Sequence, residues 1–215
     1  MEIKISPSIL SADFWELGKQ ISSVERAGAP YLHIDVMDGV FVPNISFGLT
    51  LVQSIRKYTN IVFDVHLMIS KPELYIERFI KAGADIITFH AEAAQNASEC
   101  IELIKSRGKR AGMALSPGTG AEAVMPYLDK LDMVLCMTVE PGYGGQKYMQ
   151  DIEKKISTIR EAGGERIDIQ VDGGITKDNV YRPIKAGANV IVAGTAVFCG
   201  EIEKNIKELT EKCGL

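Results

Sequence analysis

Short apolar runs alternate with longer amphipathic stretches along the whole chain. The apolar runs are rich in β-branched residues and lie near residues 3–8, 31–36, 61–67, 86–90, 110–115, 133–138, 167–171 and 189–193. Between these runs, apolar residues recur at helical spacing, for example over Ser11–Ala27, Pro72–Ala82, Ser98–Arg107 and Asp151–Ala162. The pattern predicts eight strand–helix units with almost no residues left over.

The turns that lead from a helix back to a strand repeat along the chain. They read Ala27-Gly28-Ala29, Ala82-Gly83-Ala84 and Ala186-Gly187-Ala188, with glycine where a helix commonly ends in a left-handed residue. Alternating strands and helices form a parallel sheet with helices outside it, either as a closed barrel or as a doubly wound open sheet. Eight even units, with no GxGxxG after the first strand, favour an α/β fold: one (β/α)8 TIM barrel, a single domain over residues 1–215.

The composition of the chain limits which partners and which cellular compartment we expect. The 215 residues are 46% hydrophobic, enough for a full core without disulfides, and the net charge of −4 comes from interspersed charges. The four cysteines are widely spaced with no CxxC, which is typical of free thiols. We find no signal peptide or membrane-spanning run, and therefore expect a cytoplasmic protein without a nucleic-acid or membrane partner.

Polar residues fall where the expected strands end. The chain's three histidines, His33, His66 and His90, all lie at or near such ends, where the reactive groups of barrels gather. His33 and Asp35 are two residues apart, so a strand points both to the same face. Such a buried pair predicts either a structural hydrogen bond or part of a site. His90 has the weakest case, and we expect it at the rim or against a neighbouring loop.

The Asp64 and His66 pair repeats this arrangement on the next strand. Asp172 supplies another carboxylate at the end of the seventh strand. Two imidazoles and two carboxylates from three strands suit a divalent zinc, manganese, iron or cobalt ion. We therefore predict that His33, Asp35, His66 and Asp172 ligate a metal, and that Asp64, deeper in its strand, supports a ligand from behind.

Glycine-rich segments follow the last three expected strands. They are Pro141-Gly-Tyr-Gly-Gly-Gln146, Asp172-Gly-Gly-Ile175 and Ala193-Gly-Thr195. Glycine lets backbone N–H groups approach an anion closely, and barrels commonly bind phosphate after strands seven and eight. One such loop is ordinary turn chemistry, but three in this order predict a phosphate site.

Three methionines lie at the same expected end of the barrel. Met37, Met68 and Met137 end the second, third and sixth strands, whereas Met113 lies inside the fifth. Methionine commonly fills cores, but three at one end can instead form an apolar floor that excludes water from a site. The sequence leaves both interpretations open.

Some residue types are absent from the expected site. No lysine stands at a strand's carboxyl end, which argues against Schiff-base chemistry, and no serine or cysteine has a triad around it. The reaction class that remains is acid–base chemistry on a phosphorylated sugar.

Six motifs in this order resemble the ribulose-phosphate 3-epimerase family over essentially the whole chain. They are Ser6-Pro-Ser-Ile-Leu-Ser-Ala-Asp-Phe14, His33-Ile-Asp-Val-Met-Asp-Gly39 with Phe41-Val-Pro-Asn44, Asp64-Val-His-Leu-Met68, Pro141-Gly-Tyr-Gly-Gly-Gln146, Val171-Asp-Gly-Gly174 and Ala193-Gly-Thr-Ala-Val-Phe198. The resemblance implies metal-dependent epimerisation at C3 of D-ribulose 5-phosphate to D-xylulose 5-phosphate, a step of the pentose phosphate pathway, through a cis-enediolate. It also implies a dimer or hexamer of whole barrels.

The resemblance assigns roles to individual residues. Asp35 and Asp172 become the two acid–base groups as well as metal ligands, which fits an inversion that removes a proton from one face and delivers one to the other. Ser8 and His66 are expected to contact the sugar. The phosphate end is assigned to the glycine loops, at Gly142, Tyr143, Gly144, Gly145, Gly173, Gly174, Gly194 and Thr195.

Four positions depart from the family's usual pattern. Thr195 replaces a common serine, Ser116 a common asparagine and Tyr143 a common phenylalanine, and Glu140 stands where an amide is usual. The extra carboxylate leaves open a 3-epimerase for a six-carbon sugar such as D-allulose 6-phosphate. A phosphosugar-binding or sensing protein is disfavoured because both candidate aspartates are present. Whether residues 140–149 close as a lid is also left open.

Overall fold

Eight parallel strands form the centre of the computed structural model, which describes residues 1–214. The strands pair in the order β1-β8-β7-β6-β5-β4-β3-β2, and a parallel bridge between Ser8 and His33 joins the two remaining edges. The strands are β1 Lys4–Pro7, β2 Tyr31–Met37, β3 Val62–Met68, β4 Ile86–His90, β5 Arg110–Leu115, β6 Met133–Met137, β7 Asp168–Asp172 and β8 Val190–Ala193. The predicted α/β TIM barrel is confirmed; its predicted last residue, 215, lies outside the described part.

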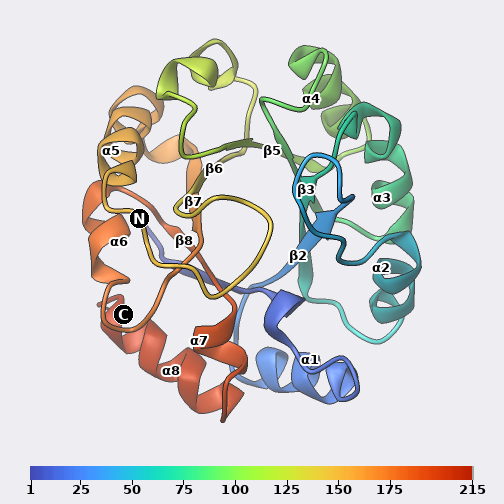
Figure 1. The fold of residues 1–215 in the computed structure, drawn as a ribbon, viewed down its shortest axis with the longest axis vertical. Coiled ribbons are helices and arrows are strands. Elements are labelled where there is room, and N and C mark those ends of the chain that lie inside the picture. Colours follow the sequence, from blue (N-terminus) through green and yellow to red (C-terminus); the bar gives the residue numbers. More distant parts are fainter. Residues whose placement is uncertain (215) are drawn as a thin grey trace.

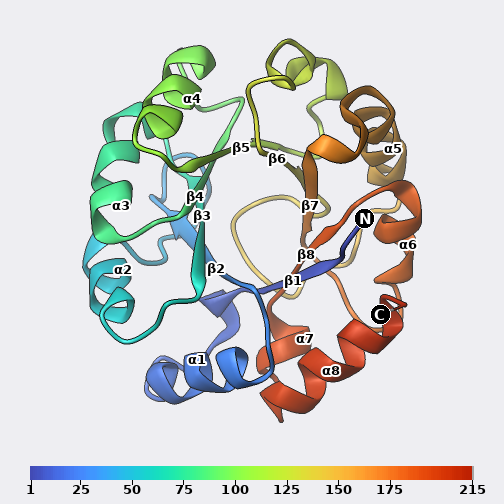
Figure 2. The ribbon, with the colours of Figure 1, turned by 180° about the vertical axis from the view of Figure 1, so that it is seen from behind.

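Helices surround this barrel on its outer side, as Figures 1 and 2 show from the two ends. They are α1 Leu17–Arg26, α2 Leu49–Arg56, α3 Ile76–Ala82, α4 Ala97–Ser106, α5 Ile152–Gly163, α6 Tyr181–Ala186, α7 Thr195–Phe198 and α8 Ile202–Lys212. Their apolar faces pack on the outward side chains of the strands in one continuous core. This burial on both faces explains why most of the strands are largely apolar.

The repeated helix-to-strand turns adopt the predicted geometry. Gly28, Gly83 and Gly187 have φ of 77°, 115° and 115°, which is left-handed backbone. At Gly83 and Gly187 an added Cβ would also meet an arginine side chain within 3 Å, so these turns need glycine for space as well as for φ.

Two predicted helices begin later than the pattern indicated. The stretch expected as a helix from Ser11 contains the end of a short 3-10 turn, Ile9–Ser11, and α1 starts only at Leu17. The Ser8 hydroxyl accepts from the Leu10 N–H, and the Asp13 carboxylate accepts from the Trp15 N–H. These short polar side chains stabilise turns that compete with helix. The segment from Pro72 likewise forms a 3-10 turn, Pro72–Leu74, before α3.

The unit after β5 contains no α-helix, so the prediction of eight strand–helix units was wrong there. Two 3-10 turns, Ala121–Ala123 and Met125–Tyr127, connect β5 to β6. Gly118 and Gly120 precede them and Pro126 lies within the second, and these residues disfavour a continuous helix. Among residues 1–214, no helix has the length and apolar character needed to cross a membrane.

Candidate active site

A cavity of about 170 Å³ opens at the carboxyl end of the barrel. The loop after β6, drawn in yellow in Figure 1, lies over this end of the barrel. The cavity is lined by residues from β2, β3, β6, β7 and β8, from the turn after β1 and from the segments after β6, β7 and β8. Both candidate aspartates, Asp35 and Asp172, belong to its lining.

The four predicted metal ligands converge at the base of this cavity. One ligand atom from each of His33, Asp35, His66 and Asp172 lies within 4.8 Å of the others. Oδ1 of Asp35 lies 3.2 Å from His33 Nε2 and 3.1 Å from His66 Nδ1. Oδ2 of Asp172 lies 3.8 Å from each of the same nitrogens. Two imidazole nitrogens and two carboxylates thus face one point.

The His33 imidazole shows that this cluster fits a metal ion. Its Nδ1 lies 2.7 Å from Oδ2 of Asp64; in the neutral imidazole this carboxylate accepts the Nδ1 N–H, and the lone pair is then on Nε2. Nε2 is fully buried and makes no hydrogen bond within residues 1–214, although Asp35 lies 3.2 Å away. A buried ring nitrogen without a hydrogen-bond partner, aimed at two carboxylates, is a metal-ligand arrangement. Asp64 occupies the supporting position expected of it.

The ionisation of the cluster without a metal separates its two aspartates. Burial favours the neutral form of Asp172, and the charge of Asp35 adds to this effect, which raises the pKa of Asp172 to about 7. Burial also opposes the charge of Asp35, but His33 and His66 outweigh it and lower the pKa of Asp35. His33 has a raised pKa because Asp35 and Asp64 outweigh its burial. The two carboxylates thus have different proton affinities, as an acid–base pair requires.

The two residues expected to contact the sugar differ in position. The Ser8 hydroxyl lines the cavity and donates to Oδ2 of Asp35 at 2.6 Å. His66 lies below the cavity lining with no exposed surface, and its Nδ1 points at the two aspartates. The geometry therefore fits His66 as a ligand better than as a direct sugar contact.

The three glycine-rich loops meet on one side of the cavity. All their predicted residues belong to its lining: Gly142, Tyr143, Gly144, Gly145, Gly173, Gly174, Gly194 and Thr195. Gly174 has φ of 67°, and an added Cβ would lie 2.5 Å from the Tyr148 backbone nitrogen. A Cβ at Gly194 would lie 2.5 Å from the Ser11 hydroxyl. Glycine is therefore needed for the loops to approach one another this closely.

The three methionines that were expected to form an apolar floor line the same cavity. Met37 and Met68 pack with Val42, while Met137 packs with Val139 in a separate cluster. All three methionines are almost fully buried. They place apolar surface beside the carboxylates, where a low dielectric strengthens electrostatic interactions.

His90, which the sequence left without a clear role, contacts a predicted ligand. Its Nε2 lies 2.9 Å from Nε2 of His66, and its Nδ1 lies 3.2 Å from Oε2 of Glu92. Burial lowers the pKa of His90 to about 4, so the imidazole is neutral near pH 7. Sequence reasoning missed Glu92, which lies two residues after His90, in the turn that follows β4. The available signal was the i, i+2 spacing already used for His33 and Asp35.

Ser11 is a second residue that sequence reasoning did not assign. It lines the cavity between the glycine loops, with its hydroxyl toward Gly194. Only the fold brings this turn beside loops from the far end of the chain. The motif that contains Ser11 was the available signal.

Known proteins with similar sequences belong to the family that the site motifs resemble. The model of the Ribulose-phosphate 3 epimerase family matches residues 4–198. The ribulose-phosphate 3-epimerase of Bacillus subtilis is 48% identical over 200 residues, 91% of this chain and 92% of that protein. The chloroplastic enzyme of Arabidopsis thaliana is also 48% identical, over 92% of this chain and 72% of that protein. The chain belongs to the ribulose-phosphate 3-epimerase family.

Distant solved structures share the barrel of this epimerase family member. The 3-keto-L-gulonate-6-phosphate decarboxylase of Vibrio cholerae superposes with a TM-score of 0.72 over 100% of this chain and 98% of that one. The sequence identity is 15%, so this likeness concerns the fold alone.

Proposed function

We propose that this chain interconverts D-ribulose 5-phosphate and D-xylulose 5-phosphate by moving a proton at C3. The observation that carries the proposal is the pair of aspartates that line one cavity with opposite pKa shifts, Asp35 lowered and Asp172 raised. Family membership and the named relatives support the same reaction. Substrate, site residues and metal are parts of this proposal.

The two aspartates divide the proton transfer between the faces of the substrate. Asp35 extends from β2 and Asp172 from β7, strands that β1 and β8 separate, so the carboxylates reach the cavity from different sides. An ionised carboxylate removes the C3 proton from one face, and a protonated one delivers a proton to the other. Each positioned group typically contributes about 10²–10⁴-fold to the rate.

His33, Asp35, His66 and Asp172 would hold a divalent ion between the two aspartates. Such an ion supplies positive charge next to the oxygens that become negative as the enediolate forms. Zinc, manganese, iron and cobalt all suit this ligand set. Asp64, hydrogen-bonded to Nδ1 of His33, would leave Nε2 of that ring free to bind the ion, and the Ser8 hydroxyl orients the Asp35 carboxylate.

The glycine loops and the cavity size suit a small phosphosugar. We assign the phosphate to the cup around Gly173, Gly174 and Gly194, and the sugar to the space between Ser8 and the methionines. Tyr143 is exposed on the loop after β6, which Asn44 anchors through a 2.8 Å hydrogen bond to the Gly142 carbonyl. A closing movement of this loop, a cytoplasmic location and assembly into a homo-oligomer remain predictions.

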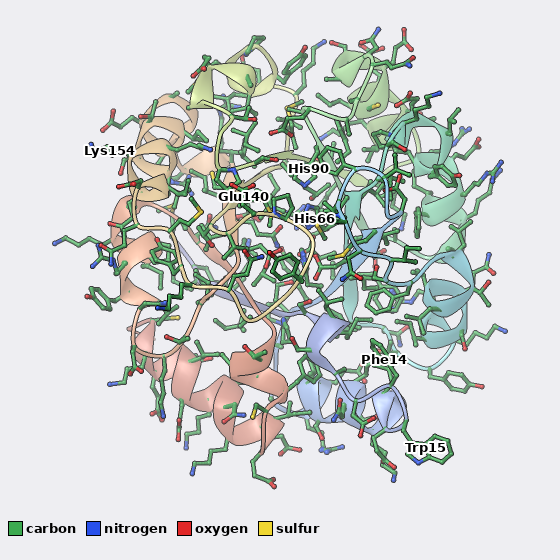
Figure 3. The ribbon with its side chains drawn as sticks, in the orientation of Figure 1. Phe14, Trp15, His66, His90, Glu140 and Lys154 are labelled. Atoms are coloured by element: carbon green, nitrogen blue, oxygen red, sulfur yellow. The ribbon has the colours of Figure 1, made fainter. Side chains whose placement is uncertain are left out.

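Glu140 bears on the alternative six-carbon substrate. Its side chain is exposed and lies outside the cavity lining, near the barrel mouth in Figure 3. A carboxylate in that position does not enlarge or reshape the sugar site, which favours the pentose phosphate.

The test is a comparison of kcat/KM for D-ribulose 5-phosphate and D-allulose 6-phosphate with the metal-supplied protein. We expect the pentose phosphate to be favoured by at least tenfold. A preference for the hexose phosphate would assign the alternative epimerase. Binding of either sugar without turnover would indicate a sensing protein.

A further inference from the structure

A line of hydrogen-bonding groups leads from His66 away from the cavity. Its Nε2 faces Nε2 of His90 at 2.9 Å, and Nδ1 of His90 faces Oε2 of Glu92 at 3.2 Å. The second carboxylate oxygen of Glu92 accepts from the Ser116 N–H and the Thr119 hydroxyl. Figure 3 shows the two imidazoles next to each other near the barrel axis. Neither His90 nor Glu92 lines the cavity.

The positions of the protons in this line depend on one another. A neutral imidazole carries one N–H and one lone pair. If Nδ1 of His66 gives its lone pair to a metal, its Nε2 carries the N–H and donates it to His90. Nε2 of His90 then accepts, and its Nδ1 carries the N–H. An ionised carboxylate only accepts, so Glu92 receives that N–H and completes a consistent arrangement.

The opposite arrangement conflicts with Glu92. If Nδ1 of His66 carried the proton, as its 3.1 Å contact with Asp35 alone would favour, Nε2 of His90 would donate and Nδ1 would present a lone pair to Glu92. Hydrogen bonds from His90, Thr119 and Ser116 outweigh the burial of Glu92 and lower its pKa to about 2. The carboxylate is therefore ionised near neutral pH and repels a lone pair on Nδ1 of His90. The Ser116 hydroxyl, which also faces this nitrogen, lies farther away at 3.4 Å.

We propose that Glu92, acting through His90, holds His66 in the tautomer whose Nδ1 offers its lone pair to the metal. Both are positioning residues, and the inference rests on the metal site of the proposed function. Asp64 gives His33 the same help by direct contact. Each imidazole of the ligand set is thus supported by a carboxylate: His33 directly by Asp64, and His66 by Glu92 through His90.

Glu92→Gln tests the inference because the loop fixes how the new amide lies. The Ser116 N–H requires an oxygen acceptor, so the amide NH2 turns toward Nδ1 of His90 and opposes its N–H. We expect Mn²⁺ binding, measured from the free-ion EPR signal during titration of metal-free protein, to weaken about 10–100-fold. Circular dichroism checks that the variant is folded.

Two control variants separate this effect from other losses. Thr119→Val removes the loop's hydroxyl contact but leaves Glu92 facing His90, and we expect near wild-type Mn²⁺ affinity. Glu102→Gln removes one negative charge from an exposed residue of α4, and it too should bind normally. An equal loss in Thr119→Val would show that loop anchoring, not the tautomer, is responsible, and would overturn the inference.

A measurement on the wild type needs no variant to fold. With ¹⁵N-histidine labelling, long-range ¹H–¹⁵N spectra of the Zn²⁺-bound protein report the tautomers of all three histidines. We expect His90 to carry its proton on Nδ1. A proton on Nε2 of His90, or unchanged affinity in Glu92→Gln, overturns the inference while the metal site stands. Absence of wild-type metal binding overturns both this inference and the metal role in the proposed function.

Discussion

The two ends of the barrel each carry a cluster of polar side chains, and the two clusters differ in how fully their members are paired. At the amino end, Lys4, Tyr31, Arg110 and Asp168 are each the first residue of a strand. The Asp168 carboxylate accepts from Lys4 at 3.0 Å, from Arg110 at 2.6 Å and from Asn189 at 2.7 Å. Arg110 also donates to the Tyr31 hydroxyl at 2.6 Å. Within residues 1–214, these amino-end side chains leave no buried polar atom unpaired.

The carboxyl end instead gathers carboxylates and imidazoles that satisfy one another only in part. His33 Nε2 has no hydrogen-bond partner, and Asp35 and Asp172 lie close enough for the charge of one to raise the pKa of the other. A paired cluster stabilises a fold, whereas an incompletely paired one is available to a ligand. The reactive end therefore differs from the structural end in having buried polar atoms without a hydrogen-bond partner.

Removing a carboxylate from the reactive end should have the largest effect on activity. For Asp172→Asn we expect epimerisation to fall at least 10²–10⁴-fold, because one face of C3 loses its proton donor and acceptor. Exchange of the C3 proton with D₂O from the face that Asp35 serves should persist in part. Proton NMR of the sugar phosphate measures both. Wild-type rates in this variant and in Asp35→Asn would contradict the assignment.

A metal ion bound at the reactive end should stabilise the folded protein. At a free ion concentration of 100 Kd, binding contributes about 2.7 kcal/mol, or roughly 5–10 °C in Tm for a chain of this size. Calorimetry of metal-free protein with added Mn²⁺ measures the shift. The same addition to His33→Gln should give little change, since the unpaired nitrogen is gone, and an equal shift there would place the ion elsewhere.

Asp168→Asn should weaken the structural end and spare the chemistry. The amide loses charge-assisted hydrogen bonds from Lys4 and Arg110, which we expect to cost about 1.5–3 kcal/mol of unfolding free energy. Urea unfolding measures the loss, and kcat at 25 °C should stay near the wild-type value. Asp129→Asn is the matched control, because Asp129 is 92% exposed and pairs only with Arg166 at the surface. A large fall in kcat for Asp168→Asn would contradict the division between the two ends.

The stability supplied by Asp168 should depend on acid pH. Burial opposes its charge, but hydrogen bonds from Asn189, Lys4 and Arg110 outweigh burial and lower its pKa from 3.8. The charge therefore contributes fully above the unfolded pKa, and the contribution is lost as pH falls below it toward the folded pKa. The stability difference between wild type and Asp168→Asn should shrink below about pH 4. A constant difference between pH 7 and pH 3 would show that charge is not its source.

Much of the fold could be predicted because it follows from local pattern. The apolar runs coincide with the observed strands within two residues at each end, and the repeated Gly turns have the left-handed geometry expected of them. Helix starts were less predictable, because Ser8 and Asp13 stabilise turns through side-chain contacts that periodicity does not register. No helix forms after β5 because Gly118, Gly120 and Pro126 disfavour one. The prediction gave these residues less weight than the even spacing of the other strand–helix units.

The candidate site was predictable where residues alternate along a strand. The i and i+2 spacing of His33 with Asp35 places both on one face, and parallel strands bring their ends together. The partners of His66 could not be predicted in the same way, because the contact to His90 depends on the distance between two neighbouring strands. Ser11 approaches Gly194 only through closure of the barrel, which joins distant parts of the chain.

The measurement that most directly tests the account is proton NMR of the wild type with D-ribulose 5-phosphate in D₂O. It is made on metal-supplied protein, after chelation, and again after metal is restored. The account predicts D-xylulose 5-phosphate with deuterium at C3, formed before chelation, absent after it and recovered with Mn²⁺ or Zn²⁺. Full turnover in verified metal-free protein, or product that keeps its original C3 hydrogen, would contradict it.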